Sequence, residues 1–100
     1  MSDTGAVLTI DEARAAFDGY VREHPLPMRG TLHLDGWYED DDDYLPVWGA
    51  REFYVDGDPT YGRMDNFVLF IDKRSGTVRE ERQLESLRKI HDMTPVTGAG

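Results

Sequence analysis

The stretch NFVLFIDKRSGTVREER, residues 66–82, decides the fold. Its first part, Asn66 to Asp72, is the most apolar segment of the chain and predicts a central strand. A short turn that ends in glycine between two β-like segments is typical of a tight hairpin, and Lys73 to Gly76 form such a turn. Gly76 supplies the positive φ that the turn requires. Thr77 to Arg82 is predicted as the partner strand.

The sequence upstream of this hairpin predicts one helix and two more strands. Thr9 to Glu12 has the T-x-x-E pattern of a capping box, and apolar residues at helical spacing extend the helix to about Glu23. Thr31 to Tyr38 alternates apolar and polar residues, which indicates a strand. Tyr44 to Val55 is rich in β-forming residues, and its one proline and one glycine favour an edge position or a bulge.

Downstream of the hairpin the pattern changes to that of a short helix. We predict this helix from about Gln83 to Asp92, followed by a tail from Thr94 to Gly100. The residues that share helical spacing, and therefore one face, are Leu84, Leu87, Arg88 and His91.

Together these elements predict a single α+β domain over residues 1–100, ordered from about residue 9 to residue 93. The order is helix, about four strands, helix. Strands joined by short turns pair antiparallel. We expect a single layer of helix on one face of the antiparallel sheet, because the apolar face of a sheet must be covered.

The chain carries a net charge of −9, most of it in one central segment. Asp35 to Asp58 holds nine carboxylates and one arginine, whereas Lys73 to Lys89 holds six bases and three acids. A chain this acidic repels nucleic acid and anionic membrane surfaces, so neither is expected as a partner. A partner of the central segment is expected to be cationic.

Cysteine usage and hydropathy indicate the compartment. The 100 residues include no cysteine, which excludes disulfides, thiolate catalysis and cysteine metal sites and is typical of the reducing cytoplasm. No basic region followed by an apolar core opens the chain, so no signal peptide is predicted. The longest apolar run, Phe67 to Ile71, is far short of the roughly 18 residues that a membrane span needs. We expect a cytoplasmic protein.

The sequence offers no strong metal or catalytic motif. A calcium loop of the EF-hand type needs glycine at its sixth position and glutamate at its twelfth, and loops started at Asp40 or Asp56 have neither. His24, His33 and His91 lie in different predicted elements. No serine lies in a G-x-S-x-G context. We therefore predict no metal site, no cofactor and no enzymatic activity.

The motif WYEDDDDY, residues 37–44, places five adjacent carboxylates between aromatic residues. Aromatic side chains dominate interface energetics, and acids around them steer a basic partner. The other interpretation is a solvated turn whose neighbouring aromatic residues belong to the core. Because adjacent carboxylates repel one another, we expect a mobile loop over residues 39–43. The candidate partner-binding residues are Trp37, Tyr38, Glu39, Asp40, Asp41, Asp42, Asp43 and Tyr44.

The segment FIDKRSGTV, residues 70–78, resembles the V-D-K-x-T-G-x-V hairpin of the YrhB-type family of small bacterial proteins. The ending HDMTPVTG is also similar to tails of actinobacterial members. Ser75 stands where the family usually has threonine, and D-K-x-x-G hairpins also occur in unrelated folds such as the PepSY type. YrhB-type domains are grouped with the immunity proteins of polymorphic toxin systems. The resemblance therefore implies a protein that binds and blocks a toxin encoded beside it.

Two hypotheses of function follow. The first is a non-catalytic, immunity-like inhibitor whose acidic, aromatic-flanked surface covers the active site of a basic partner. The second is a small structural or regulatory domain that forms a homodimer by sheet extension, through Phe67 to Ile71 and an edge strand at Tyr44 to Val55. In the second case the charge serves solubility alone.

Overall fold

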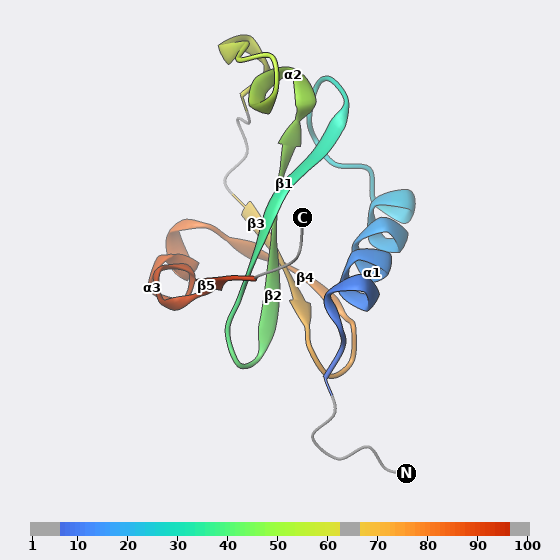
Figure 1. The fold of residues 1–100 in the computed structure, drawn as a ribbon, viewed down its shortest axis with the longest axis vertical. Helices are drawn as coiled ribbons and strands as arrows, with labels where there is room; N and C mark the ends of the chain where they lie inside the picture. The colour runs from blue at the N-terminus through green and yellow to red at the C-terminus, as the bar shows by residue number, and fades with distance from the viewer. Residues whose placement is uncertain (1–6, 63–66, 97–100) are drawn as a thin grey trace.

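The computed structural model describes residues 7–62 and 67–96, in which a sheet lies between an N-terminal and a C-terminal helix (Figure 1). The helices are α1 (Ile10–Glu23), α2 (Arg51–Tyr54) and α3 (Leu87–Asp92), with 3₁₀ turns at Pro59–Tyr61 and Leu84–Ser86. The strands are β1 (Leu32–Glu39), β2 (Asp43–Ala50), β3 (Phe67–Asp72), β4 (Val78–Arg82) and β5 (Thr94–Pro95).

The predicted α+β class is confirmed, with five strands in the sheet rather than about four. The strand order is β4-β3-β2-β1-β5, and every neighbouring pair is antiparallel. Two local features predicted from the sequence, the capping box and the glycine turn, are also present. The Thr9 hydroxyl and the Glu12 carboxylate form both bonds of the capping box at the start of α1. Gly76 has a φ of +76° in the β3–β4 turn, as the hairpin motif predicts.

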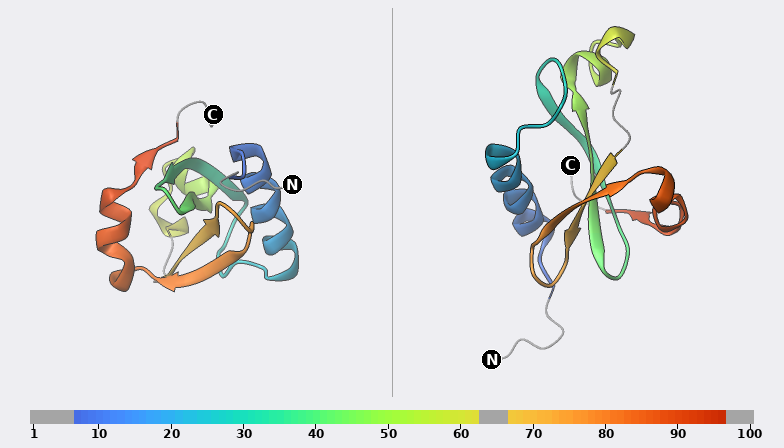
Figure 2. Two further views of the ribbon diagram at one scale, coloured as in Figure 1. Left: turned by 90° about the horizontal axis from the view of Figure 1, so that it is seen from below. Right: turned by 180° about the vertical axis from the view of Figure 1, so that it is seen from behind.

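Helices cover both faces of the sheet, which corrects the single helical layer that we expected. α1 packs on one face and α3 on the other, as the view from below shows (Figure 2). The core under α1 contains Ala13, Phe17, Trp37, Tyr44, Trp48, Leu69 and Ile71. The smaller core under α3 contains Leu45, Phe70 and Met93. Alternate side chains of β2 and β3 pack in the two cores, because successive side chains of a strand point to opposite faces.

β2 is an interior strand, which corrects the predicted edge position. Its ladder with β3 nevertheless covers only two residue pairs, at Asp43 and Tyr44. The Asp43 carbonyl accepts from the Asp40 N–H on the β1 side, so by alternation the backbone of Pro46 faces β3. Proline has no N–H to donate, and the ladder ends before it. The irregularity of this hairpin lies in β1, where the register shifts between Leu34 and Gly36.

The predicted strand from Tyr44 to Val55 ends early, at Ala50, and α2 follows. Contacts with a distant part of the chain account for this. The Arg51 N–H donates to the Thr31 carbonyl at 2.7 Å, and the Glu52 carboxylate accepts from the Thr31 N–H at 3.0 Å. These bonds fix a helical turn that includes Phe53 and Tyr54, two residues with high β propensity, since propensity yields to tertiary context.

Both ends of the described chain are held more closely than predicted. The Leu8 N–H donates to the Lys73 carbonyl at 2.7 Å, and the Leu8 carbonyl accepts from the Tyr44 hydroxyl at 2.8 Å. At the other end, Thr94–Pro95 pair with β1 instead of forming a tail. Residues 1–6 and 97–100 of the predicted loose ends, and Asn66 of the predicted central strand, lie outside the described residues.

The helix predicted from about Gln83 to Asp92 forms as a 3₁₀ turn at Leu84–Ser86 followed by α3 at Leu87–Asp92, and the predicted stripe does not face the sheet. Leu84 and Leu87, placed on the common stripe, are 78% and 50% exposed. Ile90 and Met93 pack on the sheet instead. Leu84 belongs to a 3₁₀ turn, whose spacing differs from that of an α-helix, so a stripe drawn at 3.6-residue spacing does not continue through it.

Candidate functional site

The motif WYEDDDDY forms the tip of the β1–β2 hairpin. Glu39 is the last residue of β1 and Asp43 is the first of β2, so only Asp40 to Asp42 lie between the strands. The Asp40 N–H donates to the Asp43 carbonyl at 3.0 Å and closes the turn. The predicted acidic loop over residues 39–43 is therefore a tight, hydrogen-bonded turn.

Asp40 holds this turn together with its side chain. One carboxylate oxygen accepts from the backbone N–H groups of Asp42 and Asp43, at 2.9 and 2.8 Å. The other accepts from the Lys89 ammonium on α3 at 2.6 Å. Partial burial by itself would raise the pKa of Asp40, but the bonds from Lys89, Asp43 and Asp42 outweigh it and lower that pKa.

Asp43 is the buried centre of the network, with 2% of its surface exposed. The Arg79 guanidinium on β4 donates to both of its oxygens, at 2.9 and 3.1 Å. The Lys89 ammonium lies 3.0 Å from the second oxygen. The Asp43 hydrogen bond raises the pKa of Arg79 further above its usual value. Burial alone would lower the pKa of Lys89, but its bonds to Asp40 and Asp43 raise it.

Two further ion pairs join the acidic turn to the β3–β4 turn. The Lys73 ammonium lies 2.8 Å from the Glu39 carboxylate and 4.7 Å from the centre of the Tyr44 ring. Arg74 and Asp42 are 3.7 Å apart and largely exposed, so this pair adds little stability. Four bases thus face the five carboxylates of the motif, and Asp41 alone among them has no pairing contact in the described part of the chain.

The aromatic residues of the motif divide between core and surface. Trp37 and Tyr44 are 3% and 6% exposed and pack edge to face, with ring centroids 6.4 Å apart. Both side chains belong to the core under α1, as the solvated-turn interpretation of the motif expects, and so present no exposed surface to a partner. Tyr38 points to the other face of the sheet and is 39% exposed. Of the eight candidate residues, Tyr38, Asp41 and Asp42 remain exposed.

The sequence shows the bases of this site but not their role. Lys73 to Lys89 stands out as a basic segment against the acidic one. Their pairing depends on the sheet, which brings the β3–β4 hairpin and α3 beside the β1–β2 turn. The residues that sequence reasoning missed are Lys73, Arg74, Arg79 and Lys89.

Other chemistry-bearing residues do not converge. His24 caps the end of α1, His33 on β1 lies 3.6 Å from Asp35, and His91 is exposed on α3. Within residues 7–62 and 67–96 there is no group of three or more histidine, aspartate or glutamate side chains placed to hold a metal ion. None of the helices described here is both long and apolar enough to cross a membrane.

Comparisons with family models, with curated proteins and with solved structures find no match. The resemblance to YrhB-type proteins therefore stays a prediction.

Replacing the buried carboxylate should destabilise the fold. We expect Asp43→Asn to lower the free energy of unfolding by about 2–3 kcal/mol, because it leaves Arg79 and Lys89 without their shared counter-charge. Both bases are partly exposed, and water therefore limits this loss. Asp41→Asn removes the same charge from the exposed tip and should change stability by less than about 0.5 kcal/mol. Urea unfolding of both variants measures this, and equal midpoints would contradict it.

Acid should unfold the protein partly through its turn carboxylates. The pKa of Asp40 is lowered from 3.8, and so is that of Asp72, which accepts from the N–H groups of Ser75 and Arg74. A carboxylate with a lowered folded-state pKa stabilises the fold above its unfolded pKa, and this stabilisation is lost as pH falls below about 4. Urea midpoints at pH 7 and pH 3 should therefore differ less for Asp40→Asn than for the unmodified protein. A difference that is unchanged in the variant would contradict the role of Asp40.

Proposed function

We propose that this chain is a non-catalytic binding protein that occludes a basic partner protein with the acidic tip of its β1–β2 hairpin. The observation that carries the proposal is the fixed geometry of the tip. Asp40 and Asp43 are held by backbone and side-chain hydrogen bonds, while Asp41 and Asp42 project from the turn into solvent. A preformed surface loses less entropy on binding than a mobile loop would.

The charge of the whole chain supports a cationic partner. The net charge is −9, and Lys73, Arg79 and Lys89 near the tip are occupied by ion pairs with Glu39, Asp40 and Asp43. Exposed carboxylates on a negative protein increase the association rate with a positive surface, and salt screens the effect over about 8–10 Å. Tyr38, two residues before Asp40 and half-exposed, supplies an aromatic contact beside these charges.

The proposed biological role is that of an immunity protein. It rests on the resemblance of residues 70–78 to the YrhB-type hairpin and on the acidic tip, since a toxin that acts on nucleic acid has a basic active site. Occlusion by surface contact needs no cofactor and no catalytic residue, in keeping with the dispersed histidines of this chain.

The second candidate function is self-association, and the structure changes the strand through which it would occur. β2 and β3 are interior strands and are not open to sheet extension. β4 pairs only with β3 among the described strands, and the exposed Leu84 follows it closely. An exposed strand edge is a template for pairing with a second chain. Sedimentation equilibrium should then show a dimer that a Pro substitution at an outward-facing N–H of β4 dissociates; a monomer at all concentrations would exclude it.

Neutralising the tip should weaken partner binding without affecting the fold. In a pull-down from host lysate, a basic protein should be retained by the unmodified chain and less by the double variant Asp41→Asn/Asp42→Asn. We expect a two- to tenfold loss of affinity and a weaker salt dependence, as is typical of exposed interfacial charges.

The matched control is Asp18→Asn/Asp56→Asn, which removes two exposed charges far along the chain from the tip. It should retain the same basic protein as the unmodified chain does. Equal loss in both double variants would show that net charge alone attracts the partner and would exclude the tip as its binding surface.

A further inference from the structure

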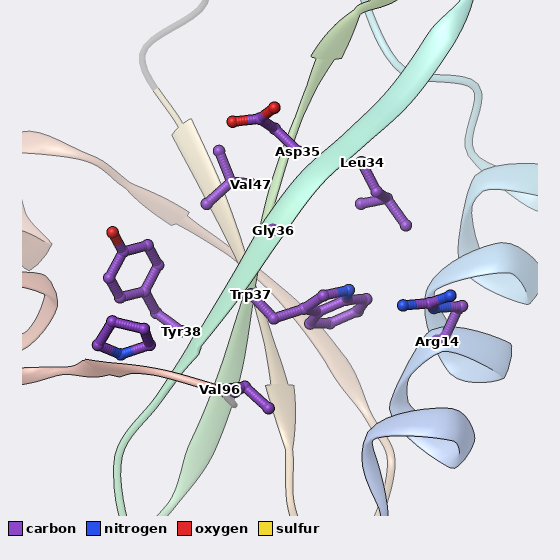
Figure 3. Close-up of a pocket in the computed structure, with 9 residues that line it drawn as sticks. Arg14, Leu34, Asp35, Gly36, Trp37, Tyr38, Val47 and Val96 are labelled. Atoms are coloured by element: carbon purple, nitrogen blue, oxygen red, sulfur yellow. The ribbon is translucent and has the colours of Figure 1, made fainter. Parts of the chain in front are cut away.

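A groove lies along β1, and Figure 3 shows the residues that line it. Its volume is about 430 Å³, which lies within the range of ligand-binding pockets. Arg14 on α1 and Leu34 and Trp37 on β1 lie on one side of the strand, and Asp35, Tyr38 and Val47 lie on the other (Figure 3). Pro95 and Val96 complete the lining, so the groove straddles the strand.

This edge of β1 is open where the groove runs. β5 pairs with β1 only at Tyr38 and Glu39, and the Val96 N–H adds one bond to the Trp37 carbonyl at 3.0 Å. From Leu32 to Gly36 no described strand pairs with this side of β1. The backbone of an open strand edge can receive an extended peptide as an additional strand.

The indole of Trp37 supplies an unused hydrogen-bond donor to the groove. Its side chain is almost fully buried, yet the Nε1–H has no acceptor within the described residues. Figure 3 shows this nitrogen on the side of the ring that faces Arg14. Buried donors are nearly always paired, because leaving one unpaired costs free energy. An acceptor atom brought by a ligand would satisfy it.

Arg14 determines the charge that this acceptor should have. Its guanidinium extends from α1 toward the Trp37 ring and lines the same groove (Figure 3). An indole N–H and a guanidinium that converge on one region favour an oxygen anion, and arginine suits a carboxylate in particular. Asp35, exposed at the rim, favours a basic side chain beside that anion.

We propose that this groove binds the carboxyl-terminal end of an extended peptide, whose terminal carboxylate accepts hydrogen bonds from Trp37 Nε1–H and Arg14. The peptide backbone lies along the open edge of β1, as β5 does further on. A peptide with many acidic side chains is disfavoured, because the chain has a net charge of −9 and Asp35 lines the groove. The site does not use the tip carboxylates Asp41 and Asp42, although Tyr38 borders both surfaces, and it goes beyond the function proposed above.

The two indole N–H signals of the ¹⁵N-labelled protein, one for each tryptophan, give a direct test. The probe is acetyl-Lys-Thr-Thr-Val with a free carboxylate, and its control is the same peptide as a carboxyl-terminal amide. The free acid should move the Trp37 indole signal, which Trp37→Phe identifies by its loss, together with the backbone amides of residues 34–36. The amide peptide should bind at least about tenfold more weakly, because it lacks the charged acceptor.

Variants on α1 separate binding from folding. Arg14→Gln should weaken the free acid about tenfold, whereas Arg22→Gln, the same change at an exposed position of the same helix, should have no effect. Equal affinity for the acid and the amide, or equal affinity of the two variants, would overturn the carboxylate site. Absence of any shift at Trp37 with the free acid would overturn the groove itself. None of these outcomes bears on capture of a basic partner by Asp41 and Asp42.

Discussion

The buried carboxylate of Asp43 is the constraint on which this structure depends. A charge removed from water is tolerated only when its counter-charges and hydrogen bonds are supplied in full. Here Arg79 comes from β4 and Lys89 from α3, so satisfying one side chain fixes a hairpin and a helix against the start of β2. Both cations also lie over the Phe70 ring, 5.7 and 5.2 Å from its centre. The polar network and the small core under α3 are therefore one unit.

This constraint decides which acidic residues are left for a partner. Glu39, Asp40 and Asp43 are engaged in folding, since their oxygens already accept from Lys73, Lys89 and Arg79. A partner that contacted these three carboxylates would have to break their ion pairs. This would cost free energy that contact with an exposed, unburied charge does not cost. In the proposed function, contact with a partner would therefore fall to the two tip residues, Asp41 and Asp42, while the paired residues hold the turn in shape.

Structural features that depend on neighbouring residues are predicted correctly from the sequence. Features that depend on contacts between residues distant in sequence are not. The capping box at Thr9 and the hairpin at Gly76 are local signals, and both are confirmed. The end of β2 at Ala50 depends on bonds between Thr31 and residues 51 and 52, and no local pattern shows these. The same holds for the site: the acidic and basic segments are visible in the sequence, but the burial of Trp37 and the pairing of Asp43 follow from the strand register.

The open edge of β1 has features that would oppose its pairing with a second copy of the chain. Its register shift between Leu34 and Gly36 interrupts a flat ladder, and Asp35 is exposed at that point. Bulges and charges are the devices by which natural proteins protect strand edges. A two-fold antiparallel dimer centred here would place one Asp35 near the other, and like charges opposite one another destabilise a strand pair. A peptide with a basic residue at that place would meet no such repulsion, so in the proposed groove Asp35 would oppose a second copy of the chain and favour a basic side chain.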